Sequence, residues 1–246
     1  MRSNQTKQSV LVKKLAENGY FFTNEGHTVS DSLDEQSMKI ADFEKRQWSI
    51  RLANTSTDLD DLLKLEASCW DTNLQSDADV IKSRIQGFPA GQWVVIKDDH
   101  VVGVLYTQLI KSRHQLLDVS STRYENQQEL CDPENGKVLQ LMGIAVLPSV
   151  KHLLLGDSLR DFVLLCAHLD GCTEVVAMTR CSAYKNNSIE RKDNTQAAAA
   201  YEVYVKSHTD PTILFHELKG ASVIDVVKGY RIEYHNNLGN DVFIRY

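Results

Sequence analysis

KVLQLMGIAVLP, residues 137–148, is an almost uninterrupted apolar run, and it is followed by GDSLRDFVLLCAHLDG (156–171) and TEVVAMTR (173–180). The first run predicts a buried strand that Pro148 ends, because proline has no N–H to donate to a sheet. The second segment has helical periodicity and ends near Gly171, and the third predicts another buried strand. The stretch therefore predicts a strand, a loop with Gly156, a helix and a strand.

Strands and helices also alternate on both sides of this stretch. Upstream, WSIRLA (48–53) predicts a strand, residues 57–70 and 77–86 predict two helices, and residues 92–110 predict a hairpin that turns at Asp98-Asp99-His100. Residues 111–137 are polar and are expected to form a functional or mobile loop. Downstream, the pattern predicts a helix at 195–207, a helix containing His216, and strands at 222–227 and 241–246. This order predicts an α/β fold with a mixed sheet.

The first 47 residues precede the alternating strands and helices. They predict an N-terminal adaptor or linker segment, separate from a domain at 48–246. Ser32 and Glu35 have the spacing of a helix capping box, and Leu33, Ile40 and Phe43 then recur at helical spacing. We therefore expect a helical appendage that links the domain to something upstream.

Composition excludes several classes of protein. The 246 residues carry a formal charge of −6 without a basic stripe, which argues against a nucleic-acid partner. The odd number of cysteines, five, and the lack of a CxxC pair indicate a reducing compartment. No signal peptide is evident and no apolar run approaches the about 18 residues that span a bilayer, so we expect a cytoplasmic protein with no membrane partner. His208, His235 and Asp210 fit no metal-ligand spacing, and no cysteine has an evident base, so neither a metal nor a cysteine nucleophile is expected.

Two segments carry a resemblance to a known fold. KHLLLG (151–156) lies at the predicted loop, and FHELKGA (215–221) contains a histidine four residues before a glycine. With the order of elements, they resemble the GNAT (Gcn5-related acyltransferase) fold, whose loop after the fourth strand binds the pyrophosphate of coenzyme A through backbone N–H groups. Lys151 and Gly156 match the family's loop pattern, whereas Leu154 replaces its middle glycine. The alternative is a plain strand-to-helix turn with an apolar filler.

The resemblance implies that a coenzyme A thioester binds as a substrate and that no cofactor is bound permanently. The residues expected at this cofactor-binding site are Val146, Lys151, Leu155, Gly156, Asp157 and Ser158.

Further segments are similar to a subgroup of this family. EASCW (66–70), AMTRC (177–181), DPTILFHELKGA (210–221) and GYRIEYHNNLGNDVFIRY (229–246) resemble the GNAT-like domains of polyketide synthase loading modules, of the curacin-synthase type. Residues 1–47 resemble the adaptor that precedes such domains. The resemblance implies decarboxylation of malonyl-coenzyme A, or of malonyl or methylmalonyl on a carrier, to an acetyl-type starter. It also implies delivery to an acyl carrier protein, with neighbouring synthase domains as partners.

Decarboxylation of a malonyl thioester moves electrons onto the thioester oxygen, so the site needs hydrogen-bond donors there and a proton for the carbon. His216, at the position where many GNAT N-acetyltransferases have tyrosine, is the predicted donor and proton source, and Thr179 is the second donor. Without the resemblance, His216 would be a partly buried helix histidine bonded to a backbone carbonyl, and Thr179 an ordinary strand threonine.

Two residues are expected to bind the acyl group. Arg231 matches the arginine of the subgroup and can hold a carboxylate with two parallel hydrogen bonds until it leaves as carbon dioxide. Trp70 corresponds to a tryptophan that lines the acyl tunnel of the subgroup, where an apolar wall favours loss of charge from the carboxylate. The alternatives are a surface strand arginine and a core tryptophan.

Two other functions compete with this hypothesis. A conventional GNAT N-acetyltransferase that uses acetyl-coenzyme A would have a tyrosine at position 216 and an intact glycine loop. A catalytically inactive GNAT-fold scaffold within a megasynthase is favoured by Leu154 alone.

Overall fold

The computed structural model describes residues 48–118, 124–184, 194–232 and 237–246. The adaptor predicted for residues 1–47 lies outside the described residues. Within the described ranges, no helix is both long enough and apolar enough to cross a membrane.

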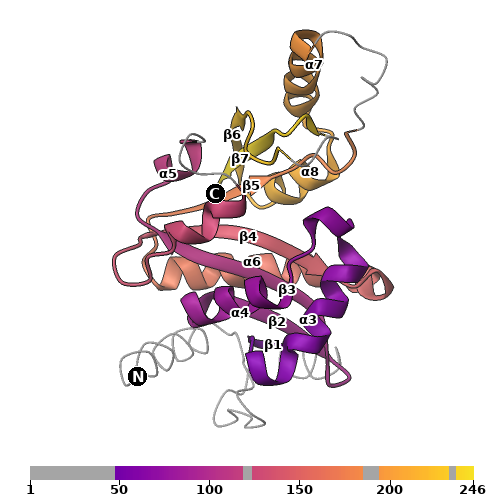
Figure 1. The fold of residues 1–246 in the computed structure, drawn as a ribbon, viewed down its shortest axis with the longest axis vertical. Coiled ribbons are helices and arrows are strands. Elements are labelled where there is room, and N and C mark those ends of the chain that lie inside the picture. The colour runs from indigo at the N-terminus through magenta and orange to yellow at the C-terminus, as the bar shows by residue number, and fades with distance from the viewer. Residues whose placement is uncertain (1–47, 119–123, 185–193, 233–236) are drawn as a thin grey trace, which may run out of the picture. The chain divides into compact units, whose positions relative to one another are not determined.

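Seven strands form one sheet in the order β1-β2-β3-β4-β5-β7-β6 (Figure 1). β4 and β5 pair in parallel, whereas the β1–β2, β2–β3, β5–β7 and β6–β7 pairs are antiparallel. The mixed sheet predicted from the sequence is therefore confirmed. The strands are β1 (Trp48–Leu52), β2 (Gln92–Lys97), β3 (His100–Ile110), β4 (Val138–Val146), β5 (Glu174–Thr179), β6 (Ser222–Val227) and β7 (Asp241–Arg245).

The α-helices lie between the strands in the predicted order, except that α5 lies in the segment predicted to be a loop. The α-helices are α3 (Thr55–Cys69), α4 (Ala78–Gly87), α5 (His114–Leu117), α6 (Leu155–Leu169), α7 (Asn194–Lys206) and α8 (Pro211–Glu217). The 3₁₀ helices are η1 (Thr72–Leu74), η2 (Pro89–Gly91), η3 (Tyr124–Leu130) and η4 (Pro148–Leu153).

The chain divides into two compact units that share β3 and β4. The first unit comprises the chain up to Thr107 and Gly143–Cys172, and the second comprises Gln108–Met142 and Thr173–Tyr246.

In the first unit, the β2–β3 hairpin turns where the sequence predicts it. Asp98 and Asp99 have φ angles of 51° and 64°. Two successive left-handed residues form the type I′ turn whose twist matches that of the paired strands, and aspartate tolerates this conformation better than most residues.

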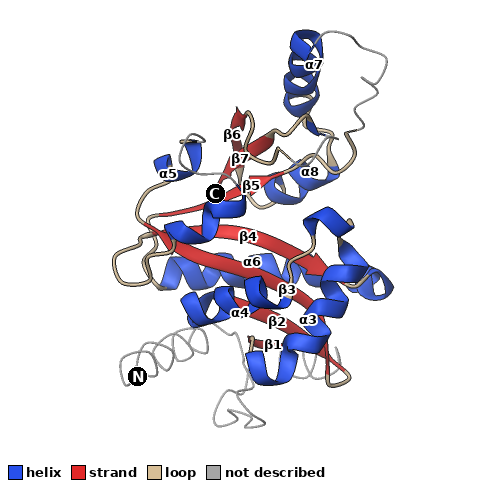
Figure 2. Cartoon of the chain, viewed as in Figure 1, coloured by secondary structure: helices blue, strands red, loops and turns tan. Residues whose placement is uncertain are grey.

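Helices cover both faces of this hairpin (Figure 2). Trp93 of β2 meets Phe162 of α6 edge to face, with ring centroids 4.8 Å apart. The Arg84 guanidinium of α4 lies 4.9 Å from the ring centroid of Tyr106, which is the ladder partner of Gln92. Because Trp93 and its neighbour Gln92 point to opposite faces, α6 packs on one face and α4 on the other.

A buried ion pair attaches the start of α3 to β1. Arg51 donates two hydrogen bonds of 2.6 and 2.7 Å to the carboxylate of Asp58, which also accepts from the backbone N–H of Asn54 at 2.8 Å. Burial alone would raise the pKa of Asp58, but the bonds from Arg51, Asn54 and Thr57 outweigh burial and hold this pKa below its usual value. The ionised carboxylate therefore stabilises the fold.

The second unit has its own core, which joins the inner residues of β5 and β7 to the polar segment before β4. Leu116, which follows His114 and Gln115 in α5, is fully buried, and Gln127 of η3 is 3% exposed. The expectation that residues 111–137 form only a functional or mobile loop is therefore incomplete, because this segment also supplies core side chains. The core members are Ile110, Leu116, Val138, Val176, Met178, Val227, Tyr230 and Phe243.

Replacing Asp58 by asparagine is expected to lower the free energy of unfolding at pH 7 by about 2 kcal/mol, because a half-buried Arg51 loses its charged partner. The folded-state pKa of Asp58 is depressed, so its contribution is fully present above its unfolded value near 3.9 and is lost as pH falls through the lower folded value. Urea unfolding of both proteins between pH 7 and pH 3 measures the difference. If the difference in free energy of unfolding between the two proteins stays constant down to pH 3, the depressed pKa of Asp58 is contradicted.

Candidate functional site

The strand-to-helix loop of the first unit presents the N-terminus of a long helix. β4 ends at Val146, η4 follows, and α6 begins at Leu155. Inside the helix, Ser158 is the first residue whose N–H bonds to a carbonyl four residues earlier, that of Leu154, at 3.1 Å. The N–H groups of Leu155, Gly156 and Asp157 have no such partner within the helix and point out of its N-terminus, where a helix favours an anion.

Leu154 adopts a backbone conformation that glycine, the residue of the family's loop pattern at this position, would adopt easily. Its φ and ψ angles are 54° and 34°, in the left-handed region, and its side chain is 64% exposed. The loop thus keeps the turn without the glycine. A non-glycine residue in this region costs roughly 1 kcal/mol, and the leucine side chain stands in solvent beside the helix N-terminus.

A buried cation offsets the acidic charge next to this N-terminus. Arg160 is fully buried and contacts the carboxylates of Asp157 and Asp161, each at 2.9 Å. Asp157 lies in the first turn of α6, where an isolated carboxylate would compete with a bound phosphate. Its pairing with Arg160 reduces the repulsion of an incoming anion.

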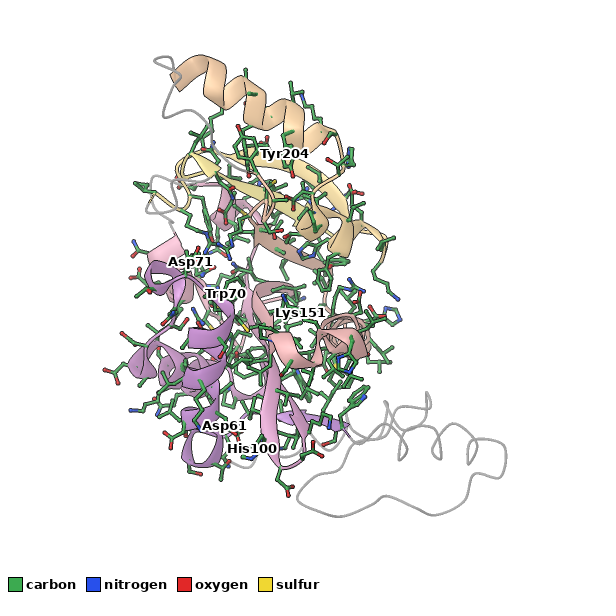
Figure 3. The ribbon with its side chains drawn as sticks, turned by 90° about the vertical axis from the view of Figure 1, so that its right-hand side faces the viewer. Asp61, Trp70, Asp71, His100, Lys151 and Tyr204 are labelled. Carbon is green, nitrogen blue, oxygen red and sulfur yellow. The ribbon has the colours of Figure 1, made fainter. Side chains whose placement is uncertain are left out.

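Trp70 lies at the same end of the first unit as Lys151 (Figure 3). Its neighbour Cys69, the last residue of α3, donates from Sγ to the Val146 carbonyl at 3.4 Å. Burial raises the pKa of the Cys69 thiol, and the charge of Lys151 acts in the opposite direction. The structure thus brings together the predicted tunnel residue and two predicted coenzyme A contacts.

In the second unit, one fully buried carboxylate fixes the position of α8. Asp210 caps the helix by accepting from the N–H of Thr212 at 2.8 Å, and Pro211 occupies the first helical position. The same carboxylate binds the segment that follows β5 and a side chain of α7. Those donors are Ser182 N (3.2 Å), Ala183 N (2.9 Å) and Tyr204 Oη (3.1 Å).

His216 lies in the last turn of α8 and is 5% exposed. Its Nδ1 is 2.6 Å from the hydroxyl oxygen of Tyr246, the residue after β7. The rings of Phe215 and Tyr246 both meet the imidazole edge to face, at centroid distances of 5.3 and 5.8 Å. The ring is buried, which the predicted catalytic role requires, and its Nδ1 faces a side-chain hydroxyl.

Thr179 is the last residue of β5 and is 8% exposed. The ladder between β4 and β5 joins Val138–Leu141 to Glu174–Ala177, so Thr179 lies two residues beyond the last β4 partner. On its other side Thr179 pairs with Val242 of β7. The parallel ladder therefore ends before the predicted donor.

Arg231 holds a buried carboxylate of the chain itself. Its Nε and Nη2 donate to Asp241, with distances of 2.8 to 3.2 Å, and Asp241 is fully buried. Because Asp241 precedes Val242, the partner of Thr179, Arg231 and Thr179 lie at the same end of β7. Arg231 is therefore not the simple surface strand arginine of the alternative hypothesis.

A buried amide network holds the residue before Arg231. The Gln140 amide and the Tyr230 hydroxyl both donate to Gln127 Oε1, at 3.0 and 3.3 Å. Gln108 donates to Gln140 Oε1 and to the Gln127 carbonyl, each at 2.7 Å. The network thus anchors Tyr230, and with it the chain at Arg231, to the core of the second unit.

The titratable residues outside this arrangement have other roles. Within the described ranges, no group of three or more metal-ligating side chains comes together. His208 pairs with Glu217, Asp210 caps the N-terminus of α8, and His235 lies outside the described residues. Burial raises the pKa of Cys172 to about 11 and that of Cys181 to about 12, so both thiols are protonated at neutral pH.

Sequence reasoning missed three residues that organise the site. From the sequence, Asp210 is considered only as a metal ligand, although aspartate followed by proline is a common start of a helix and could have identified its role as a cap. Tyr246 and Asp241 had no local signal. They contact His216 and Arg231 across 30 and 10 residues of chain, respectively.

Two solved structures are similar to this chain over most of its length. The GphF GNAT-like decarboxylase, solved in complex with isobutyryl-CoA, is 33% identical with a TM-score of 0.70, and the match covers 80% of this chain and 97% of that one. The loading GNATL domain of CurA from Lyngbya majuscula is 30% identical with a TM-score of 0.66, covering 81% and 96%. The chain belongs to the GNAT-like family of polyketide loading domains.

The wider comparison confirms the predicted GNAT fold of this GNAT-like chain. The ribosomal-protein-S18-alanine N-acetyltransferase from Escherichia coli has a TM-score of 0.52 at 14% identity, with 80% of this chain and 92% of that one covered, and this likeness shows the fold alone. A scan against protein-family models and a search of curated proteins each gave no match.

Replacing Asp210 by alanine is expected to lower the free energy of unfolding by roughly 3 kcal/mol, because several partly buried donors lose their charged acceptor. Asp77, which caps α4 through the N–H groups of Asp79 and Val80, is the matched control. Water can replace the exposed carboxylate of Asp77, so Asp77→Ala is expected to lower the free energy of unfolding by only about 1 kcal/mol. Urea unfolding followed by tryptophan fluorescence measures both, and equal losses would show that Asp210 is only a helix cap.

Replacing Leu154 by glycine is expected to raise the free energy of unfolding by about 0.5 to 1 kcal/mol, because glycine adopts the left-handed conformation without strain. Leu218 is also exposed, at 75%, but has a φ angle of −59°. Leu218→Gly should therefore lower stability, since it only adds freedom to the unfolded chain. Thermal unfolding of the two variants gives the comparison, and shifts of the same sign would contradict the strain at Leu154.

Proposed function

We propose that this chain decarboxylates a malonyl-class thioester to an acetyl-type starter and supplies the starter to an acyl carrier protein. The observation that carries the proposal is the buried histidine of α8 in a chain that is 33% identical to a GNAT-like decarboxylase. A tyrosine suits protonation of a departing thiolate, whereas an imidazole both donates a hydrogen bond and exchanges a proton near neutral pH.

The first unit supplies the binding site for the coenzyme A part of the substrate in this proposal. The N–H groups at the start of α6 and the cation of Lys151 suit a pyrophosphate. Val146, Gly156 and Ser158 belong to the same loop and helix start. The complex of GphF with isobutyryl-CoA supports a coenzyme A thioester as the ligand, and its branched acyl group makes methylmalonyl a substrate to test beside malonyl.

The chemistry needs an acceptor for one electron pair and a source of one proton. The bond between the α-carbon and the carboxylate breaks, its electrons move onto the thioester carbonyl, and carbon dioxide leaves. His216 and Thr179 donate hydrogen bonds to the resulting enolate oxygen, each contributing about 3 kcal/mol in a site without water. His216 then gives a proton to the α-carbon and regains one from solvent, which yields the acetyl thioester.

The position of Thr179 supports its part in this mechanism. The residue is 8% exposed and lies past the end of the β4–β5 ladder. A nearly buried hydroxyl is suited to donate to an oxygen of the substrate. Trp70 contributes an apolar wall, which favours conversion of a carboxylate into neutral carbon dioxide.

Arg231 has a narrower role than the sequence predicts. Asp241 occupies one edge of its guanidinium and fixes the plane of the group. A guanidinium has five N–H donors, so the role proposed for Arg231 is to orient the substrate carboxylate from a fixed position. The negative charge of Asp241 weakens the attraction of the Arg231 guanidinium for the substrate carboxylate. A weaker attraction suits a carboxylate that must depart as neutral carbon dioxide.

The remaining parts of the proposal concern the setting of the domain. Residues 48–246 form the catalytic domain, residues 1–47 join it to neighbouring polyketide synthase domains, and an acyl carrier protein in the cytoplasm receives the starter. The family membership supports synthase partners.

The test is incubation with malonyl-coenzyme A, and separately with methylmalonyl-coenzyme A, in the presence of a holo acyl carrier protein. Mass spectrometry of the thioesters should show acetyl or propionyl products. His216→Asn is expected to lower kcat about 100-fold with little change in KM, because the proton source is lost.

His208→Asn is the matched control, because His208 is exposed and its φ of 54° is one that asparagine tolerates. Its kcat should equal that of the original chain. Acetylation of an amine by acetyl-coenzyme A without decarboxylation would instead identify an N-acetyltransferase. A folded protein that converts no thioester would identify a scaffold, and either result overturns the proposal.

A further inference from the structure

We propose that Tyr246 is a positioning residue, whose phenol sets the tautomer and orientation of the His216 imidazole. The effect of Tyr246 on catalysis rests on the proposed function, whereas its effect on the tautomer of His216 does not depend on that function. The contact between His216 Nδ1 and Tyr246 Oη is 2.6 Å long, which is at the short end of the range for hydrogen bonds in proteins.

Both partners of this bond are held independently by the fold. Tyr246 follows β7, and its backbone N–H donates to the Val175 carbonyl of β5 at 2.9 Å. His216 is carried by α8, whose N-terminus is fixed by Asp210. The bond therefore joins two side chains whose backbones are already placed, and little conformational freedom is lost when it forms.

The chemistry of the two groups determines what the bond does. A neutral imidazole has one N–H, and the nitrogen that carries it is set by the hydrogen bond made by the other nitrogen. When the phenol donates to Nδ1, the proton is on Nε2, at the far edge of the ring. In the proposed mechanism, Nε2–H is then the ring N–H that donates to the enolate oxygen. When the ring is doubly protonated, the phenol oxygen accepts from Nδ1–H, so the bond persists in both states.

The aromatic neighbours add a second constraint. Phe215 and Tyr246 both meet the imidazole edge to face, and a ring in such contacts tilts less freely about its χ2 bond. Packing alone holds the plane of the ring but does not distinguish its two nitrogens. The phenol hydroxyl contacts Nδ1 specifically, so its removal separates positioning from packing.

Tyr246→Phe tests the proposal, because it keeps the aromatic ring and removes the hydroxyl. We expect kcat for decarboxylation to fall about five- to tenfold, the effect of one hydrogen bond, while KM for the thioester changes less than about twofold. Tyr106→Phe is the matched control, because it also removes the hydroxyl of a buried tyrosine, one that belongs to β3 in the first unit.

Nitrogen-15 NMR of histidine-labelled protein gives a readout that does not require activity. The His216 signals, identified by their loss in His216→Asn, should show mainly the Nε2–H tautomer in the original chain. They should show a mixture of both tautomers in Tyr246→Phe and no change in Tyr106→Phe.

An unchanged tautomer in Tyr246→Phe, or an Nδ1–H tautomer in the original chain, overturns the inference. If the tautomer shifts as expected but the original chain decarboxylates no thioester, the proposed function fails and the positioning of His216 stands. If the tautomer shifts and kcat is unchanged, the catalytic consequence assigned to Tyr246 is wrong.

Discussion

The carboxylate of Asp210 is the constraint on which the second unit depends. It binds the chain after β5, a side chain of α7 and the N-terminus of α8, so three segments that share no strand ladder meet at one buried charge. α8 is too short to be stable by itself, since isolated helices of this length are marginal in water. The position of α8, which carries His216, therefore follows from the hydrogen bonds of Asp210 and not from the intrinsic helix preference of its own residues.

Much of the fold could be predicted because its elements carry their own patterns. The apolar run that became β4, the period of α6 and the aspartate pair of the hairpin are local signals that residues within a few positions determine. The placement of His216 on a helix and of Thr179 at a strand end also followed from local patterns. The proposed roles of both residues, in contrast, came from a resemblance, and they remain predictions.

The remainder depends on contacts between distant parts of the chain, for which the sequence has no local signal. The bond from Tyr230 to Gln127 spans 103 residues, and that from His216 to Tyr246 spans 30. Such pairs are set by the order of strands in the sheet, which hydrophobic periodicity does not specify. Leu154 is a different case, because a single residue was visible but its left-handed backbone was not. The replacement of glycine favoured the scaffold hypothesis, whereas the structure keeps the turn and places the leucine side chain in solvent.

The bond between His216 and Tyr246 also has a consequence for biosynthesis. A ribosome makes α8 before it makes β7, and Tyr246 reaches the imidazole only after β7 has inserted between β5 and β6. A nascent chain that has emerged only as far as α8 therefore has the histidine without its phenol. The ordered imidazole therefore arises when β7 enters the sheet, and not when α8 forms.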